Sequence, residues 1–359
     1  MWGDIAIAFL LAFITAFVIT PYSIRLAKKV GAVDYPNDRR VNKKPMPRLG
    51  GIAVIAGFLV SAIYLIITMR IENNIDFITD GLGKKLLGFL FGAMVLGITC
   101  YIDDVKGISP LVKLAGQLIA AIIVVSCGVR IDNFTIPFKE NSIMINEVIS
   151  YILTIGWIVG ITNAINLIDG LDGLAAGVST IATVTILLVA LQSGDLPVVF
   201  LTAALAGSSL GFLHYNFNPA RIFMGDTGSM FLGYMFAAIS VIGAVKSAAT
   251  IALIVPILAL GLPILDTTFA IVRRYRGGVP IFKPDKGHLH HRLLAMGFSQ
   301  RQAVLLMYVF SAFLGLAAIA LTEVSTSVAV MIVVFVAVII LFSAKKIGIF
   351  SMKNNAGTH

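Results

Sequence analysis

Long runs of apolar residues, separated by short polar stretches, recur along the whole chain. Each run has roughly 20 residues, which is enough for a helix to cross the hydrocarbon layer of a bilayer, about 30 Å thick. Because hydrocarbon offers no partner to backbone N–H and C=O groups, each run is expected to form a helix. The pattern predicts eleven spans, near residues 3–24, 49–69, 86–102, 111–129, 148–166, 174–192, 197–215, 228–245, 247–271, 302–322 and 325–343.

The ninth predicted span contains Pro256 and Pro263. Each proline removes a backbone donor, so the pattern favours a kink or a break there. On the prolines alone, an ordinary kinked membrane helix is the simpler interpretation. A stronger bend would open a groove toward the lipid.

The basic residues predict the orientation, because they gather on the cytoplasmic side of membrane proteins. With the N-terminus outside, 21 of the 27 basic residues fall inside and only six fall outside: Arg70, Lys84, Lys85, Arg130, Lys139 and Lys246. The C-terminus is then cytoplasmic. No basic segment precedes the first span, so we expect a retained helix rather than a cleaved signal.

Composition agrees with a membrane protein: 58% of the residues are hydrophobic, 13% are charged, and the mean hydropathy is +0.96. The expected fold is all-α and polytopic, in a single domain over residues 1–359. A net charge of +9 and a pI near 9.6 would be typical of a nucleic-acid-binding protein. Here the basic residues follow the topology, so nucleic acid is not an expected partner. Cys100 and Cys127 are predicted near opposite membrane faces, too far apart for a disulfide.

Nearly all the clustering of Gly, Pro, Asp, Asn and His falls in the predicted cytoplasmic connections. These connections are residues 25–48, 103–110, 167–173, 216–227 and 272–301. Binding and catalytic residues are often carried by loops on a rigid scaffold. Together the five connections predict a site at the cytoplasmic face.

Two adjacent acids, Asp103 and Asp104, follow the third span in the string YIDDVKG. On a continued helix they would point about 100° apart. One of them could therefore bind a metal or act as a base, while a cation such as Lys106 or Lys113 holds the other. A pair of solvated acids at a helix end is the simpler interpretation of this string alone.

The string NAINLIDGLDGLAAG places Asn163, Asn166, Asp169 and Asp172 at intervals of three. That spacing draws a polar stripe along one side of a helix. Asp172 could also be the N-cap of the next span, but a cap uses one residue and leaves the other three unexplained.

A further string, NFNPARIFMGDTGS, brings Asn216, Phe223 and Asp226 into one short connection. Mg²⁺ binds one or two carboxylates, keeps several waters and completes its shell with substrate phosphate, a role that suits Asp226. Phe223 could stack on a nucleotide base or anchor the loop.

Histidines cluster in the string HLHHRL, which contains His288, His290, His291 and Arg292. Zinc is not favoured, because no cysteine lies among them and no second cluster matches them. Donors to phosphate oxygens fit better, with Arg292 able to bind in a bidentate way. The string KKPMPRLGG supplies Lys44 and Arg48, which could equally mark topology and contact lipid.

Taken together, YIDDVKG with KLAGQ, NAINLIDGLDGLAAG, NFNPARIFMGDTGS, LPILDTTFAIVRR and HLHHRL resemble the polyprenyl-phosphate N-acetylhexosamine-1-phosphate transferases, over about residues 44–301. The resemblance implies transfer of a sugar 1-phosphate from a UDP-sugar donor to a polyprenyl phosphate acceptor, with UMP as the second product. It also implies Mg²⁺, with Mn²⁺ as a substitute, a bacterial cytoplasmic membrane and a homodimer.

The resemblance also implies roles for single residues. Asp226 would bind the metal together with Asp103, and Asp103 or Asp104 would be the base that readies the lipid phosphate. His290 and His291 would lie near the reacting phosphate or the sugar. The expected substrate-binding residues are Lys44, Arg48, Lys113, Asn166, Asp169, Asp172, Asn216, Phe223, His288 and Arg292.

Within that family, HLHHRL, Arg48, Arg292 and eleven spans look more like the branch that uses UDP-GlcNAc and undecaprenyl phosphate. That branch starts teichoic acid, O-antigen or related glycans. The alternative donor is UDP-MurNAc-pentapeptide, used by the phospho-MurNAc-pentapeptide translocases. A secondary transporter is the rival from another class, but transporters place ionisable residues near the bilayer midplane rather than at its inner edge. A purely structural scaffold leaves the loop residues unexplained.

Overall fold

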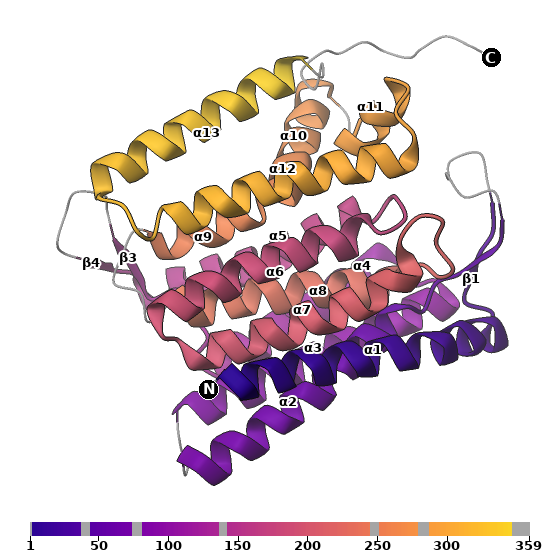
Figure 1. The fold of residues 1–359 in the computed structure, drawn as a ribbon, viewed down its shortest axis with the longest axis horizontal. Coiled ribbons are helices and arrows are strands. Elements are labelled where there is room, and N and C mark those ends of the chain that lie inside the picture. Colours follow the sequence, from indigo (N-terminus) through magenta and orange to yellow (C-terminus); the bar gives the residue numbers. More distant parts are fainter. Residues whose placement is uncertain are drawn as a thin grey trace.

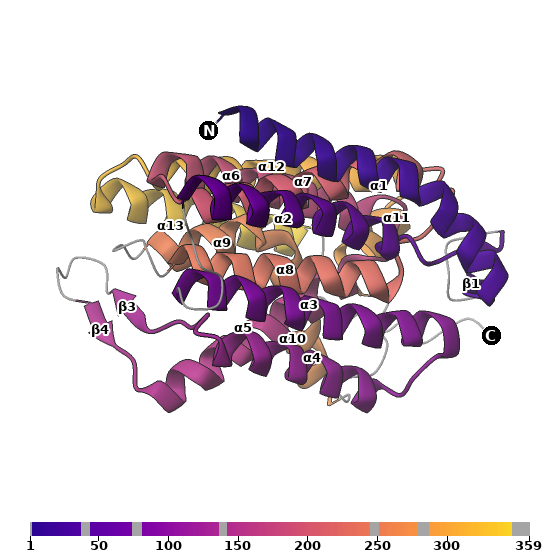
Figure 2. The ribbon, with the colours of Figure 1, turned by 90° about the horizontal axis from the view of Figure 1, so that it is seen from below.

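The computed structural model describes residues 2–36, 44–73, 81–135, 142–244, 251–278 and 287–346. These residues form a bundle of long helices with their axes roughly along one direction (Figures 1 and 2). The helices are α1 Trp2–Val30, α2 Gly51–Asn73, α3 Gly81–Lys106, α4 Pro110–Ser126, α5 Glu147–Ile168, α6 Leu174–Ser193, α7 Leu196–Asn216, α8 Gly225–Ala244, α9 Ile251–Ala259, α10 Gly261–Arg276, α11 Leu289–Ala295, α12 Gln300–Ala320 and α13 Thr326–Lys346.

Within the described ranges, nine of these helices are long and apolar enough to cross a membrane. The chain is therefore a helical, multi-pass membrane protein, as the hydropathy pattern predicts. The predicted span 111–129 corresponds to α4, which is shorter and ends at Ser126. The predicted span 247–271 corresponds to two shorter helices, α9 and α10, with residues 245–250 outside the described part.

The break between α9 and α10 falls at Leu260, between the two prolines that predict it. Pro263 lies in the first turn of α10, where its missing N–H costs no hydrogen bond. α10 then leaves the direction of α9 (Figure 1).

Several threonine hydroxyls inside the bundle are satisfied within their own helices. Thr20, Thr162 and Thr202 donate to the carbonyls four residues earlier, at 2.6 to 2.7 Å. An unpaired hydroxyl in hydrocarbon would cost free energy, and this local bond removes that cost without a partner from another helix.

α8 is the central helix, since 89% of its span window is buried, against 11% for α13. It packs against α2, α3 and α5. The hydroxyl of Tyr234, in the middle of α8, donates to the carbonyl of Phe89 on α3 at 3.0 Å. The first turn of α8 is thereby held close to the last turn of α3.

Two small strand pairs lie at opposite ends of the bundle (Figures 1 and 2). β3 Asn133–Thr135 pairs antiparallel with β4 Ser142–Met144. At the other end, β1 Val33–Asp34 pairs with β2 Met46–Pro47, which the pattern did not predict. α11 also lies at this second end.

Candidate active site

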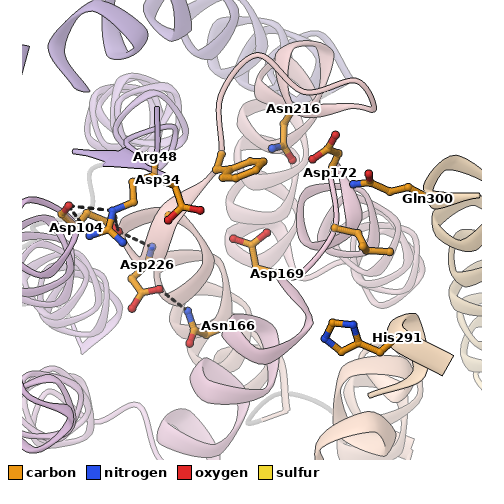
Figure 3. Close-up of a pocket in the computed structure, with 14 residues that line it drawn as sticks. Asp34, Arg48, Asp104, Asn166, Asp169, Asp172, Asn216, Asp226, His291 and Gln300 are labelled. Carbon is orange, nitrogen blue, oxygen red and sulfur yellow. Dashed lines mark hydrogen bonds and ion pairs between the residues drawn. The ribbon is translucent and has the colours of Figure 1, made fainter. Parts of the chain in front are cut away.

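A pocket of about 330 Å³ opens at the end of the bundle that carries β1 and α11 (Figure 3). It receives residues from all five of the connections singled out in the sequence. Its lining is Asp34, Arg48, Asp104, Asn166, Asp169, Gly170, Leu171, Asp172, Asn216, Phe223, Gly225, Asp226, His291 and Gln300. Of the predicted site residues, Lys44, Asp103, Lys113, His288, His290 and Arg292 are described but are not part of this lining.

Asp104 holds the start of α8. Its carboxylate, 2% exposed, accepts the N–H of Asp226 at 3.1 Å and the N–H of Thr227 at 2.9 Å. The Thr227 hydroxyl donates to the same carboxylate at 2.5 Å. The first N–H groups of a helix have no partner inside it, so Asp104 acts as their cap from another helix.

Gly225 makes this close approach possible. Its φ of +70° is unfavourable for residues with a side chain, and a Cβ there would lie 2.1 Å from the carbonyl oxygen of Arg48. The glycine before Asp226 therefore lets α8 begin against α3 and the first connection.

Asp226 stands in the first turn of α8 and faces the pocket, as Figure 3 shows. One of its oxygens forms an ion pair with Lys113, and the other accepts the Asn166 amide at 3.0 Å. Lys113 also lies 2.7 Å from Asp103. The fold therefore brings the predicted metal ligands Asp103 and Asp226 to one ammonium group.

Arg48 closes the end of α3. Its guanidinium donates to the carbonyl of Asp104 at 2.8 and 3.0 Å, and to that of Asp103 at 3.5 Å. The last carbonyls of a helix lack partners within it, so this side chain is a cap as well as part of the pocket lining. Lys44, in contrast, is exposed just before β2.

The connection 167–173 holds two of the predicted acids in different ways. Asp172 accepts the Asn218 amide at 2.9 Å and the N–H of Ala220 at 3.1 Å, so it ties two connections together. It does not cap the next helix, whose N-cap is Gly173. Asp169 points into the pocket (Figure 3). Burial, together with the negative charge of Asp226, raises the pKa of Asp169 to about 8.

Asn216 and Phe223 fix the wall between α7 and α8. The buried Asn216 amide accepts the N–H of Gly173 at 3.1 Å and donates to the carbonyl of Ile222 at 2.9 Å. The ring of Phe223 is half-buried and lines the pocket, while its backbone pairs with Pro47 and Gly50. Phe223 is placed to stack on a flat ligand.

The histidines of HLHHRL do not act alike. His291 lines the pocket on the side facing Asp169 (Figure 3). His290 is 2% exposed and packs against Gly170. Burial, with His291 beside it, lowers the pKa of His290 to about 3. His288 is buried and paired with Asp266 at 2.7 Å, and Arg292 donates to the carbonyl of Gly287 at 3.1 Å.

Sequence reasoning missed Asp34 and Gln300, which also line the pocket. Asp34 lies within the first connection, and Gln300 opens α12, so their places at the bundle end were visible in the sequence. Their distance from the pocket was not visible in the sequence, because it depends on the β1–β2 pairing and on how α12 packs against the bundle.

The sequence of this chain matches that of a known protein over nearly its whole length. The sequence model described as glycosyl transferase family 4 matches residues 86–244. A probable undecaprenyl-phosphate N-acetylglucosaminyl 1-phosphate transferase of Bacillus subtilis (strain 168) is 43% identical over 353 residues, which cover 97% of this chain and 94% of the relative. The chain belongs to glycosyl transferase family 4.

Other members of glycosyl transferase family 4 match less of the chain. A decaprenyl-phosphate N-acetylglucosaminephosphotransferase of Mycobacterium tuberculosis is 37% identical over 83% of this chain and 78% of its own length. A phospho-N-acetylmuramoyl-pentapeptide-transferase of Lactobacillus gasseri is 30% identical over 55% of this chain and 62% of its own length. These relatives are bacterial, and the apolar helices make this chain a multi-pass protein of the bacterial plasma membrane.

The glycosyl transferase family 4 match includes Asp103, Asp104, Lys113, Asp169 and Asp226, but it ends before α11. Across the described ranges, no group of three or more His, Cys, Asp and Glu side chains is arranged to hold a metal ion. Mg²⁺ does not need such a group, since one or two carboxylates, waters and phosphate oxygens are enough. Asp226 offers carboxylate oxygens at the pocket wall, so the donor chemistry fits a hard divalent ion.

Proposed function

We propose that this chain transfers GlcNAc-1-phosphate from UDP-GlcNAc to undecaprenyl phosphate. An oxygen of the lipid phosphate would attack the phosphorus that carries the sugar, and the diphosphate bond to UMP would break. The observation that carries this reaction class is the set of Asp103, Lys113 and Asp226 beside a pocket at the end of the membrane helices. The names of the relatives that match most of the chain support the transferred GlcNAc-1-phosphate group and the polyprenyl phosphate acceptor.

The charges in the pocket favour a divalent cation. Five acidic side chains of the described residues line it, those of Asp34, Asp104, Asp169, Asp172 and Asp226, and Asp169, with its raised pKa, is the least charged of them at neutral pH. Among the described residues, Arg48 is the one Arg or Lys in the lining, and its guanidinium is already bound to backbone carbonyls. A diphosphate would be repelled by such a wall, so we propose that Mg²⁺, or Mn²⁺ in its place, binds at Asp226 with Asp103 nearby. When bound, the ion would neutralise diphosphate charge and stabilise the departing UMP.

Proton transfer, phosphate binding and base stacking would fall to different residues of the chain. Asp104 is occupied as the cap of α8, so Asp103 is the better placed to take a proton from the lipid phosphate. Lys113 and His291 would donate to phosphate oxygens, and Phe223 would stack on the uracil ring. Phosphoryl transfer depends mostly on positioning and charge neutralisation, and this set provides both.

Direct attack requires no covalent intermediate. In the alternative mechanism, Asp103 or Asp104 would carry the phosphosugar before the lipid takes it. The three hydrogen bonds into the Asp104 carboxylate oppose its use as a nucleophile. A phosphorylated protein trapped with UDP-GlcNAc in the absence of lipid would contradict the one-step mechanism.

We propose that the pocket faces the cytoplasm, with the N-terminus outside and eleven crossings. In support of this, the start of α1 and the end of α13 lie at opposite ends of the bundle (Figure 1), as an odd number of crossings requires. The last turns of α1 and α13, which carry Lys28, Lys29, Lys345 and Lys346, lie at the end of the bundle that carries β1 and α11 (Figure 1). The lipid tail would stay in the bilayer beside the bent α9–α10 pair. We further propose a homodimer, and a product that starts a cell-envelope glycan.

UMP release by purified protein tests the proposal. Undecaprenyl phosphate and Mg²⁺ are supplied with either UDP-GlcNAc or UDP-MurNAc-pentapeptide, and Asp226→Asn is compared with Asp132→Asn at the far end of the bundle. We expect UMP from UDP-GlcNAc alone, lost in Asp226→Asn and kept in Asp132→Asn. UMP release only from UDP-MurNAc-pentapeptide would contradict UDP-GlcNAc as the donor. No release from either donor would reopen the transporter interpretation.

A further inference from the structure

α11 carries His290 and His291 but has only seven residues. A helix this short is not stable by itself in water, so its place must come from contacts with the rest of the chain. Which way α11 is rotated about its axis decides whether His291 faces the pocket.

A buried pair fixes the first end of α11. His288 precedes the helix, and its Nδ1 lies 2.7 Å from one oxygen of Asp266 on α10. The other oxygen of Asp266 accepts the N–H of Leu289 at 2.8 Å. Asp266 is 6% exposed and His288 is 5% exposed, so water does not compete for these bonds. One carboxylate therefore holds both the side chain and the backbone at the start of α11.

Three imidazole rings, those of His288, His290 and His291, connect the Asp266–His288 pair to the pocket. The rings of His288 and His290 are nearly parallel, with centroids 5.8 Å apart, and those of His290 and His291 are 4.2 Å apart. His290 also lies so close to Gly170 that a Cβ there would be 2.5 Å from its Nε2. His290 therefore packs against the His288 ring, the Gly170 backbone and the pocket-facing His291.

The apolar side of α11 does not fix its rotation as tightly. Leu289 and Leu293 face a second cavity, also of about 330 Å³. Its other walls come from α10, α12 and α13 and are mainly apolar. Leu293 is 7% exposed and packs in the bundle core, but apolar contacts have no directional preference. The directional bonds of Asp266 are then the contacts that determine the orientation of α11.

We propose that Asp266 is a positioning residue: through His288 it sets the rotation of α11 and keeps His291 in the wall of the pocket. This inference rests on the proposed function for its effect on catalysis. Its structural part, the docking of α11, stands apart from the reaction and can be measured without it.

Steady-state kinetics test the catalytic part in Asp266→Asn, His288→Leu and the double variant. His288→Asn retains a side-chain N–H donor and serves as the conservative variant. Thr267→Val, next to Asp266 on α10, is the matched control. We expect kcat, measured well below the thermal midpoint of every variant, to fall at least about tenfold in the first three, with the KM for UDP-GlcNAc within about twofold. The double variant should be no slower than either single one.

The conservative and control variants should keep kcat within about threefold of the wild type. Additive losses in the double variant, or a kcat loss that a smaller fraction of folded protein accounts for, would overturn the positioning role.

Hydrogen exchange of the backbone amides of residues 289–295 tests the docking itself. We expect faster exchange there in Asp266→Asn, with α12 unchanged. Gly170→Ala, which pushes on His290 from the opposite side, should give the same local effect. Equal exchange in the wild type and Asp266→Asn would overturn the inference. Wild-type protein that releases no UMP would overturn the proposed function and leave the exchange result to decide the docking.

Discussion

The carboxylate of Asp104 accepts both the backbone N–H and the hydroxyl of Thr227, at 2.9 and 2.5 Å. With the bond from the N–H of Asp226, this makes Asp104 the cap of the central helix. The neighbouring Asp103 instead faces Lys113. Two acids that are adjacent in sequence therefore have separate roles, one in holding Asp226 and one in the charged cluster beside it.

This division predicts different outcomes for the two isosteric amides. Asp104→Asn replaces one acceptor oxygen by a donor facing N–H groups, so it should lower the thermal midpoint as well as UMP release. Breaking a buried, hydrogen-bonded charge of this kind costs about 2–5 kcal/mol. Asp103→Asn should lower UMP release about 100-fold or more with a smaller change in the midpoint. Equal thermal losses in both variants would contradict the separate roles.

Lys113 is predicted to compete with a metal ion for the same carboxylates. In Lys113→Met the ammonium between Asp103 and Asp226 is removed, so Mn²⁺ should bind about tenfold more tightly, while UDP-GlcNAc binds more weakly. Mn²⁺ titration by electron paramagnetic resonance measures the first effect without turnover. Lys106→Met, at the exposed end of α3, removes the same charge and should change Mn²⁺ binding much less.

Gly225→Ala should destabilise the protein. The left-handed φ alone costs about 1–2 kcal/mol for a residue with a side chain, and the new Cβ would meet the Arg48 carbonyl. Gly156→Ala is the matched control, because a Cβ at this position in α5 would meet nothing within 4 Å. Thermal unfolding in detergent should show a clear loss for the first variant and none for the second. A neutral Gly225→Ala would mean that α8 can begin farther from the first connection.

The low pKa of the buried His290 predicts that the protein loses stability in acid. Its pKa is about 3 in the folded chain and 6.5 in the unfolded chain, so the folded protein binds fewer protons between these values. The free energy of unfolding should therefore decrease as the pH falls below about 6.5, by up to about 1.4 kcal/mol per pH unit. His290→Gln cannot titrate and should reduce this slope. Chemical unfolding from pH 7 to pH 5 compares the two, and parallel slopes would contradict the buried, neutral imidazole.

The hydropathy pattern predicted the helical membrane fold because spans in hydrocarbon must satisfy their own backbone, whatever lies around them. It also placed the break between Pro256 and Pro263, since a proline acts on its own helix. It did not establish the number of crossings. Residues 245–250 lie outside the described part, and α4 is shorter than its predicted span.

Residue type and position along the chain were enough to select Asp169, Asn216, Asp226 and His291 as neighbours, because polar residues at the same ends of spans must meet at one face. Only the tertiary structure could separate their roles. Whether Asp104 faces solvent or caps α8, and whether His288 meets a ligand or Asp266, depends on contacts between helices far apart in the sequence. The sequence by itself determined that the candidate site residues gather at one end of the helices, and helix packing decided which of their side chains cap helices and which line the pocket.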